Sequence, residues 1–410
     1  MLIKNFKALA RNKQRETALR ILNAGIEAVL VKNAIKKAIR RDGDILHIKE
    51  MVYKLSSFDK VFVVGFGKAS IACAREIEKI LPDHIDDGIV LDVSSAKLKK
   101  IKVAKCTHPV LSAQNVQNTK KMISLLKKAE KNDLVICFVS GGGSAILENP
   151  AVPISKYITM NKTLLKCGAE IHEMNTIRKH MSKVKGGQLP GYTNGATFVS
   201  LILSDVVGDD LSFIASGPTV HDETSVSDAK RIIRKYKLPK AKLIETPFKM
   251  PPHVHNFLIL NNLMAVEAMK HEAEALGLKA EILTTKEVGE ARKVGEMLAK
   301  KAKKGYAIIA AGETTVTVKG NGKGGRNQEV CLGALKNIGD SVVVSAGTDG
   351  IDNTLAAGAI VDKTTLQKNK NYKKYLDNND AFNYLKKTKD LIFTGKTGTN
   401  VADIMLVLKI

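Results

Sequence analysis

Short runs of apolar, β-branched residues alternate along the chain with longer amphipathic segments. An apolar run of four to eight residues is typical of a buried strand, and apolar residues three or four apart are typical of a helix packed on a sheet. The first half of the chain therefore predicts strands at VFVV (61–64), GIVLDV (88–93), LVICFVS (134–140) and FVSLILS (198–204), with helices between the first three.

The second half repeats the alternation. Strands are predicted at FLIL (257–260), AEIL (280–283), YAIIAAGET (306–314), SVVVSAGTD (341–349) and VADIMLVLKI (401–410), again with intervening helices. Residues 1–55 are predicted to be helical, because ETALRILNAGIEAVL spaces its apolar positions at the helical period.

This alternation indicates an α/β protein. The length of 410 residues favours two domains, and the irregular, proline-containing stretch KAKLIETPFKMPPH (240–253) marks their boundary. We expect a Rossmann-like domain over 1–240 and a second α/β domain over 241–410. Their mainly parallel sheets would be flanked by helices, with the active site in the cleft between the domains.

Composition narrows the class of protein. The N-terminus is charged from its fourth residue, no long uncharged apolar segment occurs, and the five cysteines form no CxxC pair, so we expect a cytoplasmic protein with neither a membrane span nor a disulfide framework. The net charge is +24, but the lysines are spread along the chain and aromatic residues are few, which favours a lysine-rich surface over a nucleic-acid partner.

Two glycine-rich loops follow predicted strands in the first half, where α/β proteins bind ligands. In GFGKAS (65–70), Lys68 opens a helix, a position that disfavours cations unless an anion lies between them. In SGGGSA (140–145), successive glycines expose backbone N–H groups suited to phosphate. We predict phosphate or nucleotide contacts here from Gly65, Gly67, Ser140, Gly141, Gly142, Gly143 and Ser144.

Two polar segments continue this half. NTIRKHMSKVKGGQL (175–189) is predicted to be a helix ended by its glycine pair, with Asn175, Arg178 and Lys185 as candidates for substrate binding. In LSDVVGDD (203–210), Asp205 leaves a strand end and Asp209 follows it, and such carboxylates suit Mg²⁺.

The second half carries a matching set of loops. Arg326 opens a helix after GNGKGG (320–325), so Gly324 and Gly325 are predicted to contact phosphate. Glu313 and Asn327 are further substrate candidates, and Asp349 in AGTDGID (346–352) is a third possible metal ligand. Two cationic helix openings on two domains suggest a cleft that binds a polyanion from both sides. We therefore expect the glycine loop at 320–325 to bind a phosphate or a carboxylate group.

Six motifs in this order and spacing resemble the glycerate 2-kinases of the MOFRL type: GFGKA, VSGGGSA, NTIRKHMSKVKGGQL, LSDVVGDD with SGPT, GGRNQE and AGTDGID. The resemblance covers nearly the whole chain. It implies transfer of the γ-phosphoryl group of ATP to the 2-hydroxyl of D-glycerate, and the important lysine and arginine of the family match Lys68 and Arg326. One departure is Asn353, where a glycine is expected, although asparagine tolerates a positive φ.

Phosphoryl transfer fits these residues, because it needs positioning and charge neutralisation more than covalent chemistry. Lys68 and Arg326 would offset developing charge, or Arg326 would bind the glycerate carboxylate. Asp205, with Asp209 or Asp349, would hold Mg²⁺ or accept the hydroxyl proton. The alternative is an NAD(P)-dependent hydroxypyruvate reductase, suggested by GFGKAS with Asp92 at the next strand end, although Ser70 replaces the third glycine of the fingerprint. A homodimer is plausible.

Overall fold

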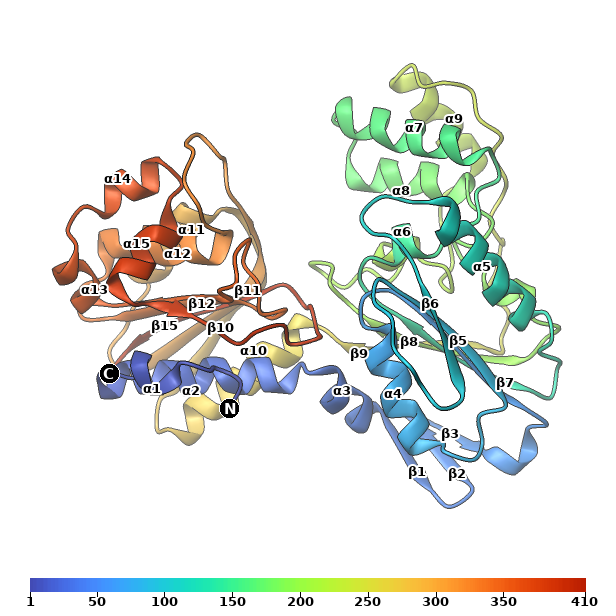
Figure 1. The fold of residues 1–410 in the computed structure, drawn as a ribbon, viewed down its shortest axis with the longest axis horizontal. Helices are drawn as coiled ribbons and strands as arrows, with labels where there is room; N and C mark the ends of the chain where they lie inside the picture. Colours follow the sequence, from blue (N-terminus) through green and yellow to red (C-terminus); the bar gives the residue numbers. More distant parts are fainter. The chain divides into compact units, whose positions relative to one another are not determined.

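The computed structural model describes all residues, 1–410. The chain divides into two compact units. The inserted unit comprises 34–204 and 209–259, and the terminal unit, which holds both chain ends, comprises 1–33, 205–208 and 260–410. Figure 1 shows a layered α/β arrangement within each unit. The expected class, two α/β domains with helices flanking their sheets, is confirmed.

The inserted unit is built on a six-stranded sheet in the order β6-β5-β4-β7-β8-β9. Parallel ladders join β4 to β5 and β7, β5 to β6, and β7 to β8. Because β5 and β7 lie on opposite sides of β4, the carboxyl ends of β4 and β7 form a topological switch point, where such sheets bind ligands. The strands are β4 Val61–Phe66, β5 Asp87–Asp92, β6 Ile101–Lys105, β7 Leu134–Val139, β8 Thr197–Leu203 and β9 Val254–Leu260.

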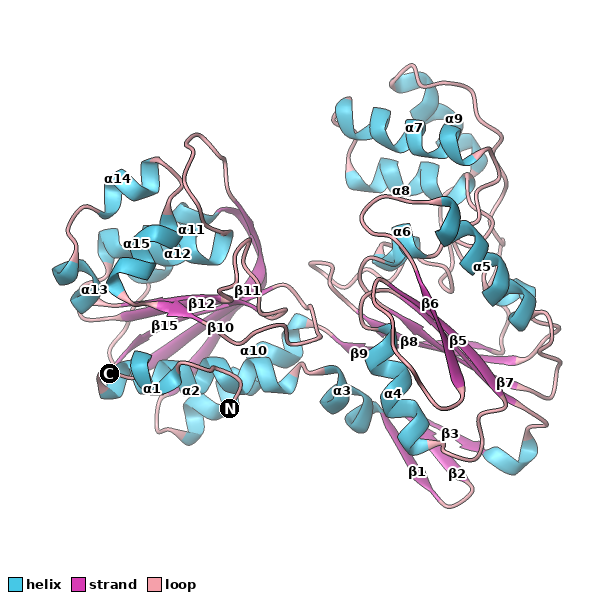
Figure 2. Ribbon diagram, in the orientation of Figure 1, coloured by secondary structure: helices cyan, strands magenta, loops and turns pink.

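Helices cover both faces of this sheet, and α7, α8 and α9 pack together in an apolar cluster of their own (Figure 2). The helices are α3 Val31–Ala38, which spans the junction of the two units, α4 Ser70–Ile80, α5 Ala113–Leu126, α6 Gly143–Ile146, α7 Ile154–Lys166, α8 Ile171–His180 and α9 Val226–Lys235. Short 3₁₀ turns occur at Leu55–Ser57, Pro190–Tyr192 and Ile214–Ser216.

The terminal unit has a mixed sheet in the order β10-β11-β15-β12-β13-β14. The β10/β11 ladder is parallel, and β15 pairs antiparallel with both β11 and β12. With the antiparallel β12/β13 and β13/β14 ladders, four strands (β10, β11, β12 and β14) share one direction. The strands are β10 Lys279–Glu290, β11 Tyr306–Thr315, β12 Val342–Gly347, β13 Gly358–Val361, β14 Leu391–Ile392 and β15 Asp403–Lys409.

In Figure 1, α2 and α10 lie on one face of this sheet, and α11, α12, α14 and α15 lie on the other. The predicted final core strand is confirmed as β15, which sits between β11 and β12. The helices are α1 Phe6–Leu9, α2 Lys13–Ala28, α10 Asn262–Ala275, α11 Ala291–Lys300, α12 Arg326–Ala334, α13 Lys363–Lys368, α14 Tyr372–Asp377 and α15 Ala381–Thr388, with a 3₁₀ turn at Leu335–Asn337.

The division of the chain differs from the predicted boundaries of 1–240 and 241–410. Residues 1–33 pack with 260–410, and the second crossing lies at 259–260. The cause is α2, whose apolar face is buried in the terminal unit: Gly25 lies against Met269 of α10, where an added Cβ would come within 2.6 Å of the Met269 side chain. An amphipathic pattern predicts a helix but does not say which sheet it will cover.

The helical prediction for residues 1–55 is correct for α1, α2 and α3 and wrong beyond them. Strands β1 Ile39–Asp42, β2 Ile45–Ile48 and β3 Met51–Lys54 form a small antiparallel sheet. Its two tight turns contain Gly43 and Lys49, both with positive φ. The signal for this sheet was the sequence Asp42-Gly43, because Asp-Gly between short apolar runs favours a hairpin.

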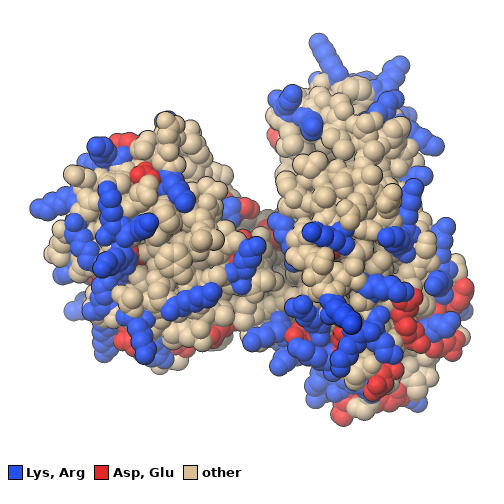
Figure 3. All heavy atoms as spheres, viewed as in Figure 1, with Lys and Arg blue, Asp and Glu red and all other residues tan.

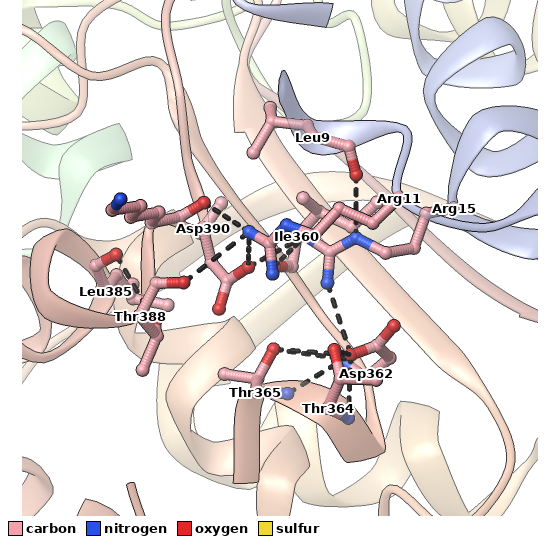
Figure 4. A network of polar contacts seen from close by, with 12 residues as sticks. Leu9, Arg11, Arg15, Ile360, Asp362, Thr364, Thr365, Leu385, Thr388 and Asp390 are labelled. Carbon is pink, nitrogen blue, oxygen red and sulfur yellow. Dashed lines mark hydrogen bonds and ion pairs between the residues drawn. The ribbon is translucent and has the colours of Figure 1, made fainter. Parts of the chain in front are cut away.

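A buried ion network joins the start of α2 to the C-terminal part of the terminal unit (Figure 4). Arg15 is completely buried, and its guanidinium donates to Asp390 at 2.8 Å, lies 3.2 Å from Asp362, and donates to the Leu9 carbonyl at 2.9 Å. Arg11 also pairs with Asp390, at 2.7 Å. Two carboxylates from near the C-terminus thus depend on cations from the first fifteen residues.

Lysine and arginine side chains are spread over both units in the view of Figure 3, as expected for a scattered positive charge. The structure contains no helix that is both long enough and apolar enough to span a membrane. All five cysteines are free thiols, and Cys73 and Cys137 are buried in the core.

Candidate functional site

The two glycine-rich loops of the inserted unit interlock at the switch point of its sheet. The Lys68 N–H donates to the Gly141 carbonyl at 3.0 Å, and the Ala69 N–H donates to the Ser140 hydroxyl at 3.2 Å. Gly67 has a φ of +111° and lies so close to Ser140 that no side chain would fit. The first role of these glycines is therefore to bring two loops into contact.

The Ser140 side chain is engaged within the protein in this structure. It is buried, and its hydroxyl is used between the Ala69 N–H and the Phe66 carbonyl. The direct phosphate contact predicted for Ser140 is thus not available to its hydroxyl, which holds the two loops together. Gly141, Gly142 and Ser144 are partly exposed beside it.

Lys68 is the exposed cation of this region. Its side chain has no ion pair or hydrogen bond, and its Cε lies 3.2 Å from the position that a Cβ on Gly142 would take. His108 lies over the same glycine, with its Cδ2 at 3.1 Å from that position. Burial and the charge of Lys68 both lower the pKa of His108, which favours a neutral imidazole. Sequence reasoning missed His108, although it follows a strand end like the other site residues.

A cavity of about 290 Å³ adjoins Gly142 and Ser144. Arg178, predicted to bind substrate, lies on its wall, where Nε donates to Asn161 Oδ1 at 2.6 Å. The lining residues are His108, Pro109, Val110, Leu111, Gly142, Ser144, Ala145, Tyr157, Ile158, Asn161, Lys162, Leu165 and Arg178.

Helix α8 ends at His180, not at the glycine pair 186–187, and Lys185 is fully buried. Its ammonium donates to the carbonyls of Ser144 and Leu147 at 3.0 and 2.8 Å and to Glu148 at 2.7 Å. Because all three donors are used, the direct substrate contact predicted for Lys185 is not available in this structure. Lys185 supports the glycine loop from beneath. Burial lowers its pKa, although Glu148 opposes the shift.

Asn175 reaches the glycine loop through a serine pair. Its side-chain oxygen accepts from Ser216 at 3.1 Å, and the Ser216 hydroxyl lies 3.2 Å from that of Ser144. Asn175 is buried, so it positions Ser144 in this structure.

Asp92, which with GFGKAS suggested an NAD(P)-dependent reductase, is buried in the inserted unit. Its carboxylate accepts from the Ile71 N–H and the Ser70 hydroxyl, both at 3.2 Å, and so caps the start of α4. It is only 2% exposed, and burial raises its pKa. A ribose hydroxyl has no access to this carboxylate, which counts against a nicotinamide site here.

In the terminal unit, Arg326 opens α12 as predicted and is held by two carboxylates. Nε and Nη2 donate to Asp403 at 2.6 and 3.2 Å, and Nη1 donates to Glu313 at 2.7 Å. Burial opposes its charge, but Asp403 and Glu313 together raise the pKa of Arg326. A guanidinium has five N–H donors, so one hydrogen remains on each terminal nitrogen for an anion.

Asp403 was not predicted, because it begins the antiparallel strand β15 instead of following a strand. It also accepts from Asn327 Nδ2 at 2.8 Å, while Asn327 Oδ1 accepts from Ser345 at 2.6 Å. Asn327 is 1% exposed, so its predicted substrate contact is replaced in this structure by a role in holding Asp403.

The glycine loop before α12 approaches a carboxylate of the protein itself. Asp352 accepts from the backbone N–H groups of Asn327 and Gln328 at 3.2 and 2.9 Å. A Cβ on Gly325 would collide with Asp352, so glycine is required there. The phosphate contacts predicted for Gly324 and Gly325 thus compete with an acidic cap that already occupies the helix N-terminus. Burial raises the pKa of Asp352 to about 6.

The carboxylates predicted to bind metal lie in loops after strand ends: Asp205 and Asp209 after β8, and Asp349 after β12. Asp349 Oδ1 accepts from the Ile351 N–H at 3.0 Å. The structure gathers no group of three or more His, Cys, Asp or Glu side chains into a metal site. The three predicted carboxylates therefore do not form a complete metal site by themselves. Mg²⁺ held by one carboxylate together with substrate phosphates would not need such a site. Asn353 adopts φ +53°, as expected for a residue in place of glycine.

Comparison with known proteins supports the resemblance seen in the motifs. Residues 17–247 match the family described as "Domain of unknown function (DUF4147)", and residues 306–403 match the MOFRL family. A glycerate 2-kinase from Pyrococcus horikoshii is 40% identical over 96% of this chain and 97% of its own length.

The crystal structure of a glycerate kinase from Thermotoga maritima superposes with a TM-score of 0.89 at 35% identity, covering 96% of this chain and 99% of that chain. A putative hydroxypyruvate reductase from Agrobacterium vitis is 36% identical over 84% of this chain and 86% of its own length. Identity of this extent, over nearly the whole of both chains, shows that this protein belongs to the glycerate 2-kinase family of DUF4147 and MOFRL proteins.

Proposed function

We propose that this protein is an ATP-dependent D-glycerate 2-kinase, which transfers the γ-phosphoryl group of ATP to the 2-hydroxyl of D-glycerate and forms 2-phospho-D-glycerate and ADP. The observation that carries the proposal is Arg326, an arginine held from two sides by Asp403 and Glu313 with two N–H donors left over. That arrangement suits an anion that offers two oxygens, such as a phosphate or a carboxylate. The near-complete match to proteins named glycerate 2-kinase supports it.

The residues divide into those that would touch the reactants and those that position them. Lys68 and Arg326 would neutralise charge on the transferred phosphoryl group and on the leaving oxygen. Backbone N–H groups of Gly141 and Gly142 and the Ser144 hydroxyl would hold phosphate, whereas the Gly143 N–H already donates to the Ser140 carbonyl at 3.2 Å. Arg178 would bind a part of the substrate away from the transferred phosphoryl group. Ser140, Asn175, Lys185 and Asn327 would act through the loops that they support.

In the reaction, the 2-hydroxyl oxygen of D-glycerate forms a bond to the γ-phosphorus, the bond from that phosphorus to the bridging oxygen breaks, and ADP leaves with the electron pair. The hydroxyl proton would pass to a carboxylate, for which Asp205 is our candidate. Mg²⁺, bound through Asp205, Asp209 or Asp349 together with phosphate oxygens, would supply charge neutralisation.

The proposed kinase activity is tested by identifying its products. We expect ADP release that depends on D-glycerate, a ³¹P NMR signal of a 2-phosphate coupled to the C2 proton, and loss of turnover in EDTA that returns with added Mg²⁺. A 3-phosphate product would contradict the regiochemistry, and full activity in EDTA would contradict the metal.

The alternative, an NAD(P)-dependent hydroxypyruvate reductase, is favoured by the names of two relatives and by GFGKAS. The buried Asp92 argues against it. Oxidation of NADH or NADPH by hydroxypyruvate, with no ADP release from ATP and D-glycerate, would establish the alternative instead. The cytoplasmic location, the homodimer and the convergence of Lys68 and Arg326 on one cleft stay predictions.

A further inference from the structure

The cavity beside Gly142 has an apolar character that D-glycerate does not need. Helix α7 forms one wall, on which the apolar Ile158 and Leu165 are accompanied by Tyr157, Asn161 and Lys162. Apolar residues from other segments complete the lining, among them Val110, Leu111 and Ala145. D-glycerate has three carbons, each bearing oxygen, so it offers no apolar surface to cover these walls.

The mouth of the cavity carries exposed apolar side chains. Leu165 of α7 is 64% exposed, and Val110 is 59% exposed. Exposed apolar residues beside a concave site commonly mark where a ligand covers them. Arg178 lies on the same cavity, and its Nε bond to Asn161 fixes a guanidinium plane of the kind that stacks on flat rings.

Cations lie on and beside the cavity. Lys162 and Arg178 line it, and the exposed Lys68 lies with His108 over its lining residue Gly142. A ligand that fills the cavity would therefore have a flat apolar part between α7 and residues 108–111, and an anionic part at Lys68. A nucleoside triphosphate has these two parts in this order.

We propose that this cavity binds the nucleoside of the phosphoryl donor and directs its phosphates across Gly142 to Lys68, so that the donor site belongs to the inserted unit. This inference rests on the proposed kinase function for the identity of the donor. It adds the place of the base, which the glycine loops alone do not indicate. Its volume of about 290 Å³ accommodates a purine with part of its ribose.

The chain contains no tryptophan, so Leu165→Trp creates a single fluorescent reporter at the mouth. We expect ATP and adenosine to change the emission of the new indole saturably, and D-glycerate or inorganic tripolyphosphate to leave it unchanged. The control is Phe248→Trp, since Phe248 is 96% exposed and does not line the cavity. Its emission should not respond to any of these compounds.

A second variant keeps the inference testable if tryptophan perturbs the site. Leu165→Asp should raise the KM for ATP at least about 10-fold, the scale of losing one apolar contact, while the KM for D-glycerate changes less than about twofold. An indole that is silent to ATP, together with an unchanged KM for ATP in Leu165→Asp, would overturn the proposal. So would an indole that responds to D-glycerate and not to adenosine.

The failure of this inference is separable from failure of the kinase proposal. If the unmodified chain turns over ATP and D-glycerate but the new indole ignores ATP, the donor base binds elsewhere and only the inference is lost. If the indole responds to ATP and adenosine while no ADP is released with D-glycerate, the cavity is a nucleoside site and the acceptor has been misassigned.

Discussion

The glycine-rich loops of the two units look alike in sequence and are used differently. In the inserted unit, Gly67 and Gly142 let two loops approach each other and leave Lys68 exposed without a partner. In the terminal unit, Gly325 lets α12 approach Asp352, and the nearby cation is already paired with Asp403 and Glu313. A glycine loop thus reports close approach, but what it approaches has to be read from the structure.

The buried cations of the two units differ in a corresponding way. Lys185 holds the carbonyl of Ser144 and is therefore joined directly to the candidate site. Arg15 holds Asp362 and Asp390, neither of which belongs to the candidate site. In one unit the buried cation supports both fold and site, and in the other it supports the fold alone.

The largest effect is expected from removing these buried cations. Arg15→Met would leave the buried Asp362 without its cation and Asp390 with Arg11 alone, and should lower the free energy of unfolding by about 3–5 kcal/mol. Lys185→Met should cost a similar amount. Only Lys185→Met should also lower kcat in the fraction that remains folded. Chemical denaturation and assays at low temperature measure both quantities.

Arg20→Met is the matched control, because Arg20 is exposed and pairs with Glu272 at the surface. Its unfolding free energy should change by less than about 1 kcal/mol. If Arg15→Met unfolds at the same denaturant concentration as this control, the network of Figure 4 does not fasten the terminal unit.

The two candidate cations come next. Lys68→Ala and Arg326→Ala should each lower kcat at least about 100-fold, the scale of losing one electrostatic stabiliser and equal to about 2.7 kcal/mol. Arg326→Lys should recover little, since an ammonium cannot bind Asp403 in a fork and still face an anion. Lys97→Ala, which removes an exposed lysine elsewhere, should keep normal turnover. Near-normal kcat in both alanine variants would remove these residues from the active site.

The acidic cap of α12 predicts a pH dependence of stability. Burial, aided by the nearby charge of Asp403, raises the pKa of Asp352 to about 6 from an ordinary 3.8. The folded state therefore binds this proton more tightly, and the stabilisation, at most about 3 kcal/mol, is present below pH 4 and lost as the pH rises through 6. Asp352→Asn should gain stability relative to the parent between pH 4 and 7. Parallel stability curves over this range would contradict the assignment.

The smallest effect is expected at the support of Arg326. Asp403→Asn keeps the shape of the side chain but weakens the fork, and should lower kcat about 10-fold through misplacement of the guanidinium. Because Asp403 would act through Arg326, the double variant Asp403→Asn/Arg326→Ala should be no slower than Arg326→Ala alone. Additive losses in this cycle would mean that Asp403 has a separate role.

Much of the fold could be predicted because its central strands are continuous apolar runs. The apolar runs at β4, β7, β12 and β15 predict buried strands clearly. The positions of Lys68, Asp349 and the glycines followed from the rule that ligands bind in the loops after such strands. The order and direction of β15 could not be predicted, since an apolar run carries no information about its neighbours in the sheet. Asp403 was missed for that reason.

The roles of the polar residues were harder to predict than their locations. Lys185, Asn327 and Ser140 do lie among the candidate site loops, but each is buried and occupied by the protein itself. A charged side chain in a polar motif looks the same in sequence whether it faces solvent or an internal carboxylate such as Glu148. Only the burial of the side chain and the hydrogen bonds that it already makes distinguish a residue that binds substrate from one that supports the fold.

The discontinuous terminal unit also imposes an order on biosynthesis. When residues 34–259 have left the ribosome, the inserted unit has all of its strands, whereas α2 still lacks α10 and the sheet that it will cover. The apolar face of α2 and the cation of Arg15 must wait for residues beyond 260, and Asp390 emerges well after α10. Premature termination before α10 therefore leaves a complete inserted unit preceded by an unpaired, aggregation-prone helix.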